Sequence, residues 1–387
     1  MNGQNPRQIA TEILRRRRSG SDFTEDLLER ALAQARLSPA DRALCQELVY
    51  GVVLWQAALD WLIARKTNGR KQNPVLQNLL RLGLYQIFWL DRIPGHAAVH
   101  ETVELTRRNG FGAQTGFMNA VLRGYLRETE ATRNLLAELK TSQPALGWSH
   151  PAWLVARWQK RWGAEKTAQL LEWNNRRPRT YARLNMLKFR GTGETPVPLL
   201  LEKWREEGVE YDFVRRDWLG ENPVFELKSH PPLASLESFR DGWFYIQDPS
   251  TLLAVKELDP QAGETILDFC AAPGGKTTFI AQLMNNQGRI VARDVSGERL
   301  RLIRENCQRL GVSIVHCQLP IANLETPGTT SESNRQPAIG NWQFDRILVD
   351  APCSNTGVMR SGLPNVSKRV TISQLSMSDQ CTILLRK

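Results

Sequence analysis

The sequence has few cysteines, and their spacing fits neither a disulfide framework nor a zinc site. Six cysteines are scattered over 387 residues, and no two of them form a Cys-x-x-Cys pair. No apolar run approaches the ~18 residues that a membrane-spanning helix needs, and the N-terminal residues lack the apolar segment of a secretory signal. We therefore expect a cytoplasmic protein with reduced thiols, no metal site and no membrane contact.

Two common phosphate-binding motifs are also missing from the glycine-rich loop at residues 270–276. A P-loop needs a glycine five residues before its Gly-Lys-Thr, and Cys270 stands at that place. The Gly-x-Gly-x-x-Gly fingerprint of dinucleotide sites is absent as well. Ala271, Ala272 and Pro273 occupy positions where a polyphosphate would need backbone donors. The loop therefore favours a ligand that carries less negative charge.

The surroundings of this loop predict a cofactor site. A strand-like run at residues 264–268 precedes the loop and a helical pattern begins at Thr277, so the order is strand, glycine turn, helix. Gly274 and Gly275, just before Lys276, lack a Cβ. Their backbone can take a positive φ and approach a ligand closely at the carboxyl end of the strand. The alternative is an ordinary tight turn.

A second strand-like run, residues 289–294, ends in a carboxylate. Asp294 is placed to accept hydrogen bonds from the hydroxyls of a ribose. It could instead act as the N-cap of the helix predicted from Ser296. The loop and the acid together favour S-adenosylmethionine as the cofactor.

A third buried strand, residues 344–350, leads into a Pro-Cys motif. Asp350 and Cys353 are expected to emerge at the same sheet edge as the glycine loop. A thiolate can add to C6 of a cytosine and make C5 nucleophilic enough to take a methyl group, or a second cysteine can act as the base that eliminates the adduct. Asp350 could position the base or contact the donor. Cys353 could instead be a small buried apolar residue, although its neighbours are typical of a loop.

These segments resemble the Sun (RsmB) family of RNA cytosine-C5 methyltransferases. The donor loop of that family corresponds to Cys270, Ala271, Ala272, Pro273, Gly274, Gly275 and Lys276, its ribose acid to Asp294, and its Pro-Cys motif to Asp350 and Cys353. Further segments that look like the family are 247–250, 304–306 and 309–311. The resemblance implies S-adenosylmethionine-dependent methylation of cytosine C5 in small-subunit (16S) ribosomal RNA. It assigns Cys353 and Asp350 to catalysis. It assigns the residues of the loop, together with Asp294 and Asp350, to binding of the cofactor.

The sequence departs from this family at its nucleophile. In the family the attacking thiolate belongs to a Thr-Cys motif on the next strand, and the Pro-Cys cysteine assists product release. This sequence contains no Thr-Cys dipeptide, and residues 380–385, around Cys381, are predicted to form the helix before the missing strand. We therefore expect a C-terminally truncated, inactive chain whose fourth strand has an unpaired edge and which is poorly soluble. The family's adenine-contacting acid is also absent, and Gln318 is a possible substitute.

Positive charge predicts a polyanionic partner. The net charge is +11, the isoelectric point is near 9.6, and cations along a surface release the counterions of phosphates. Mere solubility is the alternative. The clustered arginines that we predict to bind RNA are Arg15, Arg16, Arg17, Arg18, Arg107, Arg108, Arg176, Arg177 and Arg179. Tryptophans lie near some of them, but tryptophans at helical spacing are more often core residues.

Apolar periodicity divides the chain into three regions. Residues 1–145 predict an all-α bundle, which resembles the RNA-binding factor NusB, and residues 146–244 predict a small α+β linker domain. The family resemblance implies that this linker domain guides RNA into the catalytic cleft. Residues 245–387 predict an α/β Rossmann-like methyltransferase core with strands at 264–268, 289–294, 312–317 and 344–349. A monomer is expected. Two other functions stay open: a DNA cytosine-C5 methyltransferase with Cys353 as nucleophile, and a non-catalytic RNA-binding module.

Overall fold

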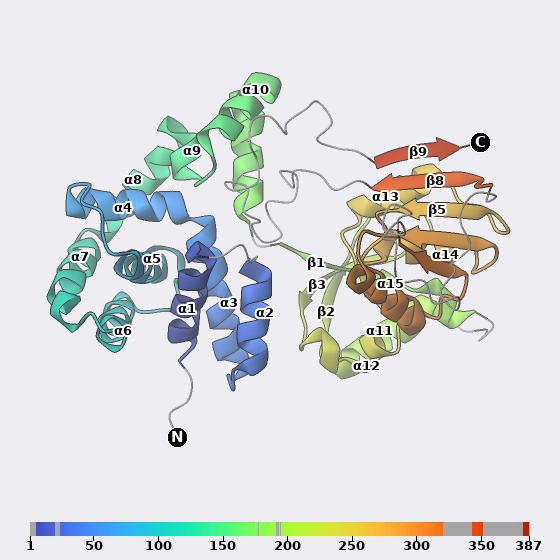
Figure 1. Cartoon of the computed structure of the whole chain (residues 1–387), viewed down its shortest axis with the longest axis horizontal. Coiled ribbons are helices and arrows are strands. Elements are labelled where there is room, and N and C mark those ends of the chain that lie inside the picture. The colour runs from blue at the N-terminus through green and yellow to red at the C-terminus, as the bar shows by residue number, and fades with distance from the viewer. Residues whose placement is uncertain are drawn as a thin grey trace, which may run out of the picture. The chain divides into compact units, whose positions relative to one another are not determined.

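The chain divides into two compact units, and the boundary between them along the described sequence lies between Pro178 and Arg179. The computed structural model describes residues 5–19, 24–176, 178–190, 193, 195–319, 343–350 and 382–386. Figure 1 shows helices in the first unit and two β-sheets with their helices in the second. This confirms the predicted fold class, whereas the predicted boundaries at residues 145 and 244 stay predictions.

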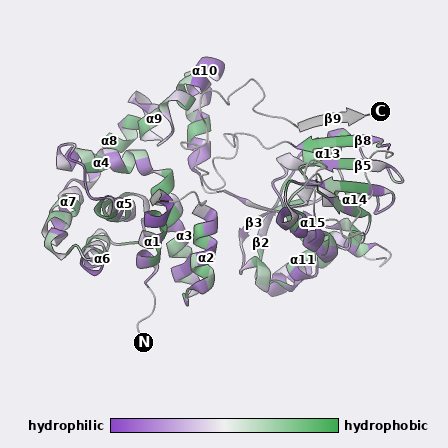
Figure 2. Ribbon diagram, viewed as in Figure 1, coloured by the Kyte–Doolittle hydropathy of each residue, from purple (hydrophilic) through white to green (hydrophobic). Residues whose placement is uncertain are grey.

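The described part of the first unit is helical. Its elements are α1 (Pro6–Ser19), α2 (Thr24–Gln34), α3 (Pro39–Leu54), α4 (Gln56–Thr67), α5 (Pro74–Trp89), α6 (Gly95–Arg108), η1 (Gly112–Gln114), α7 (Thr115–Arg127), α8 (Thr129–Ser142), α9 (Pro144–Gly147) and α10 (Ala152–Asn175). Local sequence sets several starts. The Ser38 hydroxyl accepts a hydrogen bond from Asp41 N–H at the start of α3, and Asn73 caps α5 in the same way. The apolar stripes of α1 to α7, visible in Figure 2, form one buried core, and buried residues of α10 form a second, smaller cluster.

The apolar run at 43–63, which the sequence suggests as one helical stretch, is two helices. Trp55 separates α3 from α4, and its ring lies 5.2 Å from that of Trp89 and 6.2 Å from that of Trp148. Within the described residues, no single helix is long and apolar enough to cross a membrane; α3 and α4 pass that test only as a pair, bent by 75°.

The second unit begins with an antiparallel sheet. Its strands are β1 (Thr180–Leu184), β2 (Glu210–Phe213), β3 (Val224–Ser229) and β4 (Phe244–Ile246), in the order β2-β3-β1-β4; the helical elements beside them are η2 (Met186–Phe189), α11 (Pro196–Glu207), η3 (Asp217–Leu219), η4 (Leu233–Ser235) and α12 (Glu237–Arg240). Trp204 of α11 is fully buried against Phe225 and Phe244. The first three strands confirm the predicted α+β pattern. The sequence did not indicate β4, which has three residues, or α11, which starts with a Pro-Val-Pro segment.

A mostly parallel sheet follows. Its strands are β5 (Thr265–Phe269), β6 (Arg289–Arg293), β7 (Val315–Gln318), β8 (Arg346–Asp350) and β9 (Thr382–Arg386), and its helices are α13 (Ser250–Leu258), α14 (Gly275–Leu283) and α15 (Gly297–Leu310). The order is β7-β6-β5-β8-β9, and only the β8–β9 pair is antiparallel among the described strands. The four predicted strands are confirmed, although β7 starts three residues later than expected. Apolar side chains on β5 and β6 are buried, as a sheet covered by helices requires.

The prediction for the C-terminal segment was wrong. Residues 382–386 form β9, not a helix, and they pair with β8 from Arg346↔Arg386 to Asp350↔Thr382. The edge of β8 that we expected to be unpaired is therefore covered. A run this short and apolar fits a strand or a helix equally well by periodicity, so a tertiary pairing decides. Cys381 lies outside the described residues.

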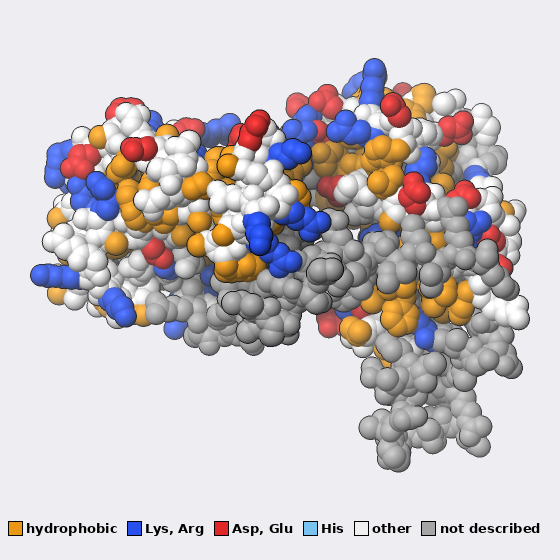
Figure 3. All heavy atoms as spheres, turned by 90° about the horizontal axis from the view of Figure 1, so that it is seen from above, with side chains coloured by type: hydrophobic (Ala, Val, Ile, Leu, Met, Phe, Trp, Pro, Cys, Tyr) orange, Lys and Arg blue, Asp and Glu red, His pale blue; other side chains and the backbone are white. Residues whose placement is uncertain are grey.

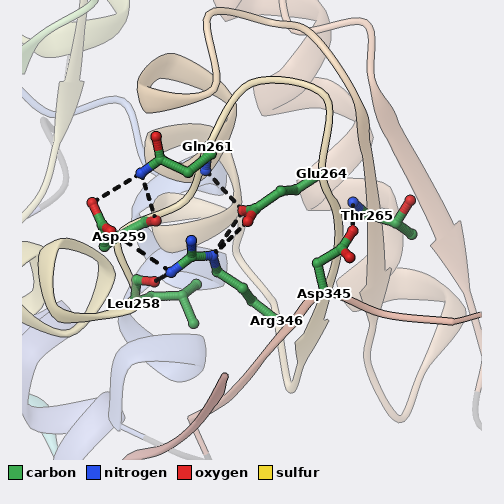
Figure 4. A network of polar contacts seen from close by, with 7 residues as sticks. All are labelled: Leu258, Asp259, Gln261, Glu264, Thr265, Asp345 and Arg346. Carbon is green, nitrogen blue, oxygen red and sulfur yellow. Dashed lines mark hydrogen bonds and ion pairs between the residues drawn. The ribbon is translucent and has the colours of Figure 1, made fainter. Parts of the chain in front are cut away.

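A largely buried arginine ties the amino ends of β5 and β8 to α13. Figure 4 shows Arg346 between Glu264 and the carbonyl of Leu258. Its Nε lies 2.7 Å from Glu264 Oε2 and its Nη1 donates to Leu258 O at 2.6 Å. The hydrogen bond from Arg346 to Glu264 raises the pKa of Arg346. Because the glycine loop leaves β5 at the other end, this network fixes the sheet without entering the candidate site.

Replacing Arg346 with methionine is expected to lower the free energy of unfolding by roughly 2–3 kcal/mol, because the half-buried Glu264 carboxylate loses its cationic partner and keeps only Gln261 N–H as donor, and the carbonyl of Leu258 loses the Arg346 donor. Arg301→Met is the control, since its ion pair with Glu305 is exposed on both sides and is worth about 0.5 kcal/mol or less. Urea unfolding followed by circular dichroism measures both. Equal losses in the two variants would contradict the assignment.

Candidate functional site

The glycine loop has two left-handed positions. Gly274 has φ +101°, as predicted, but the second such residue is Cys270, with φ +68°, and not Gly275. Gly275 instead starts α14 and needs to lack a Cβ for packing. A Cβ there would lie 3.1 Å from Tyr245 Cε1 and 3.2 Å from Gln247 Nε2. The loop is thus shaped by Gly274 and pressed closely against the end of β4.

Asp294 holds the loop from the next strand. Its Oδ2 accepts from Ala272 N–H at 3.0 Å, and its Oδ1 accepts from Val295 N–H and pairs with Arg299 Nε at 2.7 Å. Ser296 is the N-cap of α15, so the alternative interpretation of Asp294 as that cap was wrong. A carboxylate has about four acceptor sites. Three of them are used by groups of the described residues.

Two side chains of α15 complete the support of the loop, and sequence reasoning assigned them no role. Arg299 Nη2 donates to Ala272 O at 3.3 Å, and Asn306 Nδ2 donates to Pro273 O at 2.9 Å. Asn306 belongs to one of the segments that resemble the methyltransferase family, which was the available signal. The loop backbone is therefore fixed from both sides.

Lys276 and Asp350 connect the glycine loop to the strand before the Pro-Cys motif. Lys276 Nζ lies 2.5 Å from Asp350 Oδ2. Asp350 ends β8, which is the direct neighbour of β5 in the sheet. The structure therefore brings these predicted residues together at one edge. Cys353 lies outside the described residues, so its convergence on the loop stays a prediction.

Asp268 is a site residue that the sequence analysis did not select. It lies near the carboxyl end of β5, is 1% exposed, and its Oδ2 accepts from Thr277 Oγ1 at 2.6 Å. Its Oδ1 has no hydrogen-bond partner within the described residues. Burial raises the pKa of Asp268 to about 7, against the lowering effect of the Thr277 hydrogen bond. A buried acceptor without a partner at this edge suits a ligand with N–H donors.

Gln318 lies at the corresponding end of β7. It is 8% exposed, and its Oε1 accepts from Arg293 Nη2 at 3.3 Å. That Gln318 takes the place of the family's adenine-contacting acid stays a prediction. Arg293 is also buried, and burial lowers its pKa.

The arginines predicted to bind RNA mostly pair with glutamates. These ion pairs are Arg15 and Arg16 with Glu12, Arg107 with Glu104, Arg176 with Glu172, and Arg179 with Glu226. Arg17 is half-buried and donates to Thr24 Oγ1, Arg108 is exposed, and the side chain of Arg18 and all of Arg177 lie outside the described residues. Exposed pairs of this kind are weak and exchange readily for phosphates.

Two of the arginine clusters lie at different places along α1. Asn109, just after α6, donates to Gln8 near the start of α1, so Arg107 and Arg108 lie near that end. Arg15 follows seven residues later, about 10 Å along the helix axis. On the face in Figure 3, Lys and Arg side chains likewise lie in separate groups with Asp and Glu between them. Their role in RNA binding stays a prediction.

Three protein families match parts of this chain. The family "16S rRNA methyltransferase RsmB/F" matches residues 255–384, the NusB family matches residues 4–127, and the RsmF/B-like ferredoxin-like domain matches residues 150–210. Together they cover the donor loop, the helical bundle and the start of the antiparallel sheet.

Curated relatives are similar over most of the chain. The probable ribosomal RNA small subunit methyltransferase B of Bacillus subtilis (strain 168) is 35% identical over 389 residues, which cover 98% of this chain and 82% of the relative. The ribosomal RNA small subunit methyltransferase B of Escherichia coli (strain K12) is 36% identical over 84% of this chain and 70% of its own length. The crystal structure of PH0851 shares the fold, with a TM-score of 0.67 and 22% identity over 95% of this chain and 79% of that one.

Proposed function

Because the chain belongs to the ribosomal RNA small subunit methyltransferase B family, we propose that its glycine loop binds S-adenosylmethionine for methyl transfer to C5 of a cytosine in small-subunit ribosomal RNA. The observation that carries this proposal is the ion pair between Lys276 and Asp350. It joins the predicted donor loop to the strand that leads into the Pro-Cys motif.

The charges at this edge suit the proposed donor. When bound, S-adenosylmethionine supplies a methyl group on a positively charged sulfonium, and its amino acid part carries an ammonium. Asp268, Asp294 and Asp350 place three carboxylates around the loop, and Lys276 and Arg299 are cations beside them. The Oδ1 of Asp268, which has no hydrogen-bond partner within the described residues, is an acceptor for the ammonium, and the remaining acceptor site of Asp294 is available to the ribose.

Cysteine chemistry supplies the second half of the proposal. A thiolate bonds to C6 of the cytosine, which activates C5, and the C5 proton is later removed as the C6–sulfur bond breaks. We assign that last step to Cys353. Asp350, whose carboxylate is held by the ion pair with Lys276, orients the cytosine base. The attacking cysteine of the family is not in this sequence. We therefore assign the attacking role to no residue of this sequence.

The test is incubation of the purified chain with tritiated S-adenosylmethionine and unmethylated 16S ribosomal RNA, followed by digestion to nucleosides. We expect salt-sensitive retention of the RNA on filters together with the tritiated donor, and any tritium incorporated into the RNA is expected in 5-methylcytidine. Tritium in another nucleoside, or no retention of the donor, would contradict the proposal. Tritium in DNA that is lost on Cys353→Ala would replace the RNA assignment with a DNA methyltransferase.

A further inference from the structure

The antiparallel sheet has two different faces where β1 pairs with β4. Ala182 and Phe244 point to one side and join the apolar core around α11. Arg183 and Tyr245 are register partners on the other side, because side chains alternate along a strand. That side packs against α14, the helix that follows the glycine loop. The first sheet therefore presents an arginine to the proposed donor helix.

Arg183 is a buried cation that contacts α14 at three places. It is 2% exposed; its Nη2 donates to Thr278 Oγ1 at 3.0 Å and its Nη1 to Gln282 Oε1 at 3.5 Å. Its guanidinium carbon lies 4.8 Å from the ring centroid of Phe279. The Nε atom has no hydrogen-bond partner within the described residues. The two terminal nitrogens of Arg183 thus bind two side chains of α14 that lie about one helical turn apart.

Burying the guanidinium of Arg183 costs free energy of desolvation, so this group is a poor means of stabilising the fold. No carboxylate is among the partners of Arg183 in the described part of the chain, and burial lowers its pKa to about 9, so it stays charged at neutral pH. Replacing a buried charged group with an apolar residue of similar volume is often neutral or stabilising. The buried charge of Arg183 and its two hydrogen bonds to α14 therefore indicate a role other than stabilising the fold.

The first turn of α14 carries the groups that shape the candidate site. Gly275 begins the helix directly after the loop, Lys276 holds Asp350, and Thr277 holds Asp268. Thr278, the next residue, is the one that Arg183 binds most closely. A fork on side chains four residues apart fixes both the rotation of a helix and its position along its axis. Any slip of α14 would move all three groups.

We propose that Arg183 is a positioning residue through which the antiparallel sheet fixes α14 and the donor loop. The inference rests on the proposed function, because it requires that the loop bind S-adenosylmethionine. Arg183 touches neither donor nor RNA in this account. Its loss weakens donor binding and leaves RNA binding unchanged.

The test compares Arg183→Lys, Thr278→Val and the double variant in the full chain. Lysine keeps the charge but not the fork, and valine keeps the shape of threonine without its hydroxyl. Titration calorimetry with S-adenosylmethionine is expected to show a rise of about tenfold in the dissociation constant for each single variant. The double variant is expected to raise the dissociation constant by less than the product of the two single effects, because both changes remove the hydrogen bond between Arg183 and Thr278; Thr278→Val in addition removes the bond from its hydroxyl to Gly275 O. Filter binding of 16S ribosomal RNA is expected to stay at the wild-type level.

Arg346→Lys is the matched control, because it alters another largely buried arginine, which lies at the edge of the parallel sheet opposite the glycine loop. It is expected to lower the urea midpoint while the donor dissociation constant stays unchanged. Wild-type donor affinity in both Arg183→Lys and Thr278→Val would overturn the inference. If Arg183→Lys does not fold, Thr278→Val alone decides. Absence of donor binding in the wild-type chain would overturn the proposed function itself, and the inference with it.

Discussion

Asp268→Asn is expected to make the chain more stable at pH 8 while weakening its binding of S-adenosylmethionine. Burial raises the pKa of Asp268 from 3.8 to about 7. At pH values between these two pKa values, Asp268 is therefore protonated in the folded chain and ionised in the unfolded chain. The contribution of this group to the free energy of unfolding falls as the pH rises from about 4 to about 7, by an amount on the order of 4 kcal/mol. Asparagine removes this loss, and its oxygen still accepts from Thr277.

Donor binding is expected to respond in the opposite direction. The ammonium of the donor needs an ionised acceptor at Asp268 Oδ1, so the donor affinity of the wild-type chain rises as the pH passes through about 7. Asp268→Asn loses both this pH dependence and most of the affinity. Asp345→Asn, an exposed carboxylate at the other end of the sheet, is the control. Urea unfolding and donor titration at pH 5 and pH 8 measure both effects. A variant that is less stable than wild type at pH 8, or that binds donor equally well, contradicts this role.

Gly242→Ala is expected to prevent stable folding of the second unit. Gly242 has φ +73°, and a Cβ there would lie 1.9 Å from Arg309 O and 2.7 Å from Arg309 C. These are backbone atoms at the end of α15, so no side chain can move aside. Asn185 locks the same contact, since its Nδ2 donates to Gly242 O at 2.8 Å and to Leu310 O at 2.9 Å. Strain and overlap together are expected to lower the free energy of unfolding by roughly 4 kcal/mol or more.

The control for this variant is Gly263→Ala. Gly263 also has a positive φ, +90°, but a Cβ added there would meet no atom within 4 Å. Only backbone strain remains, so the expected loss is about 1 kcal/mol. Differential scanning calorimetry compares the two variants with wild type. Similar melting temperatures for both variants would show that the contact with α15 is not tight.

The sequence indicated the parts of the site whose signals are local. Gly274 follows a buried apolar run and precedes a helical pattern, and Asp294 ends a second such run, so both could be placed on a sheet edge. Asp268 ends the first run and carries the same local signal, although no role was assigned to it, whereas Arg183 could not be found in this way. The partners of Arg183 are Thr278 and Gln282, 95 and 99 residues later in the chain. Only the folded structure shows that these polar groups are buried together.

The same limit explains the error at the C-terminal segment. Thr382 to Arg386 is too short for its periodicity to separate a helix from a strand. Its pairing with Arg346 and its neighbours on β8 decides the matter, and that pairing joins residues more than thirty positions apart. Burial of Arg183 and pairing of β9 are both consequences of tertiary structure. Neither changes the predicted order of strand, glycine turn and helix.

The most direct test of the central claim is titration calorimetry of the wild-type chain and of Asp294→Ala with S-adenosylmethionine. We predict saturable binding of one donor per chain, because Asp294 both shapes the loop through Ala272 and keeps one acceptor site for the ribose. We predict that this binding is lost in Asp294→Ala and kept in Glu305→Gln, an exposed change on α15. No binding by the wild-type chain, or equal binding by Asp294→Ala, would contradict the proposed donor site.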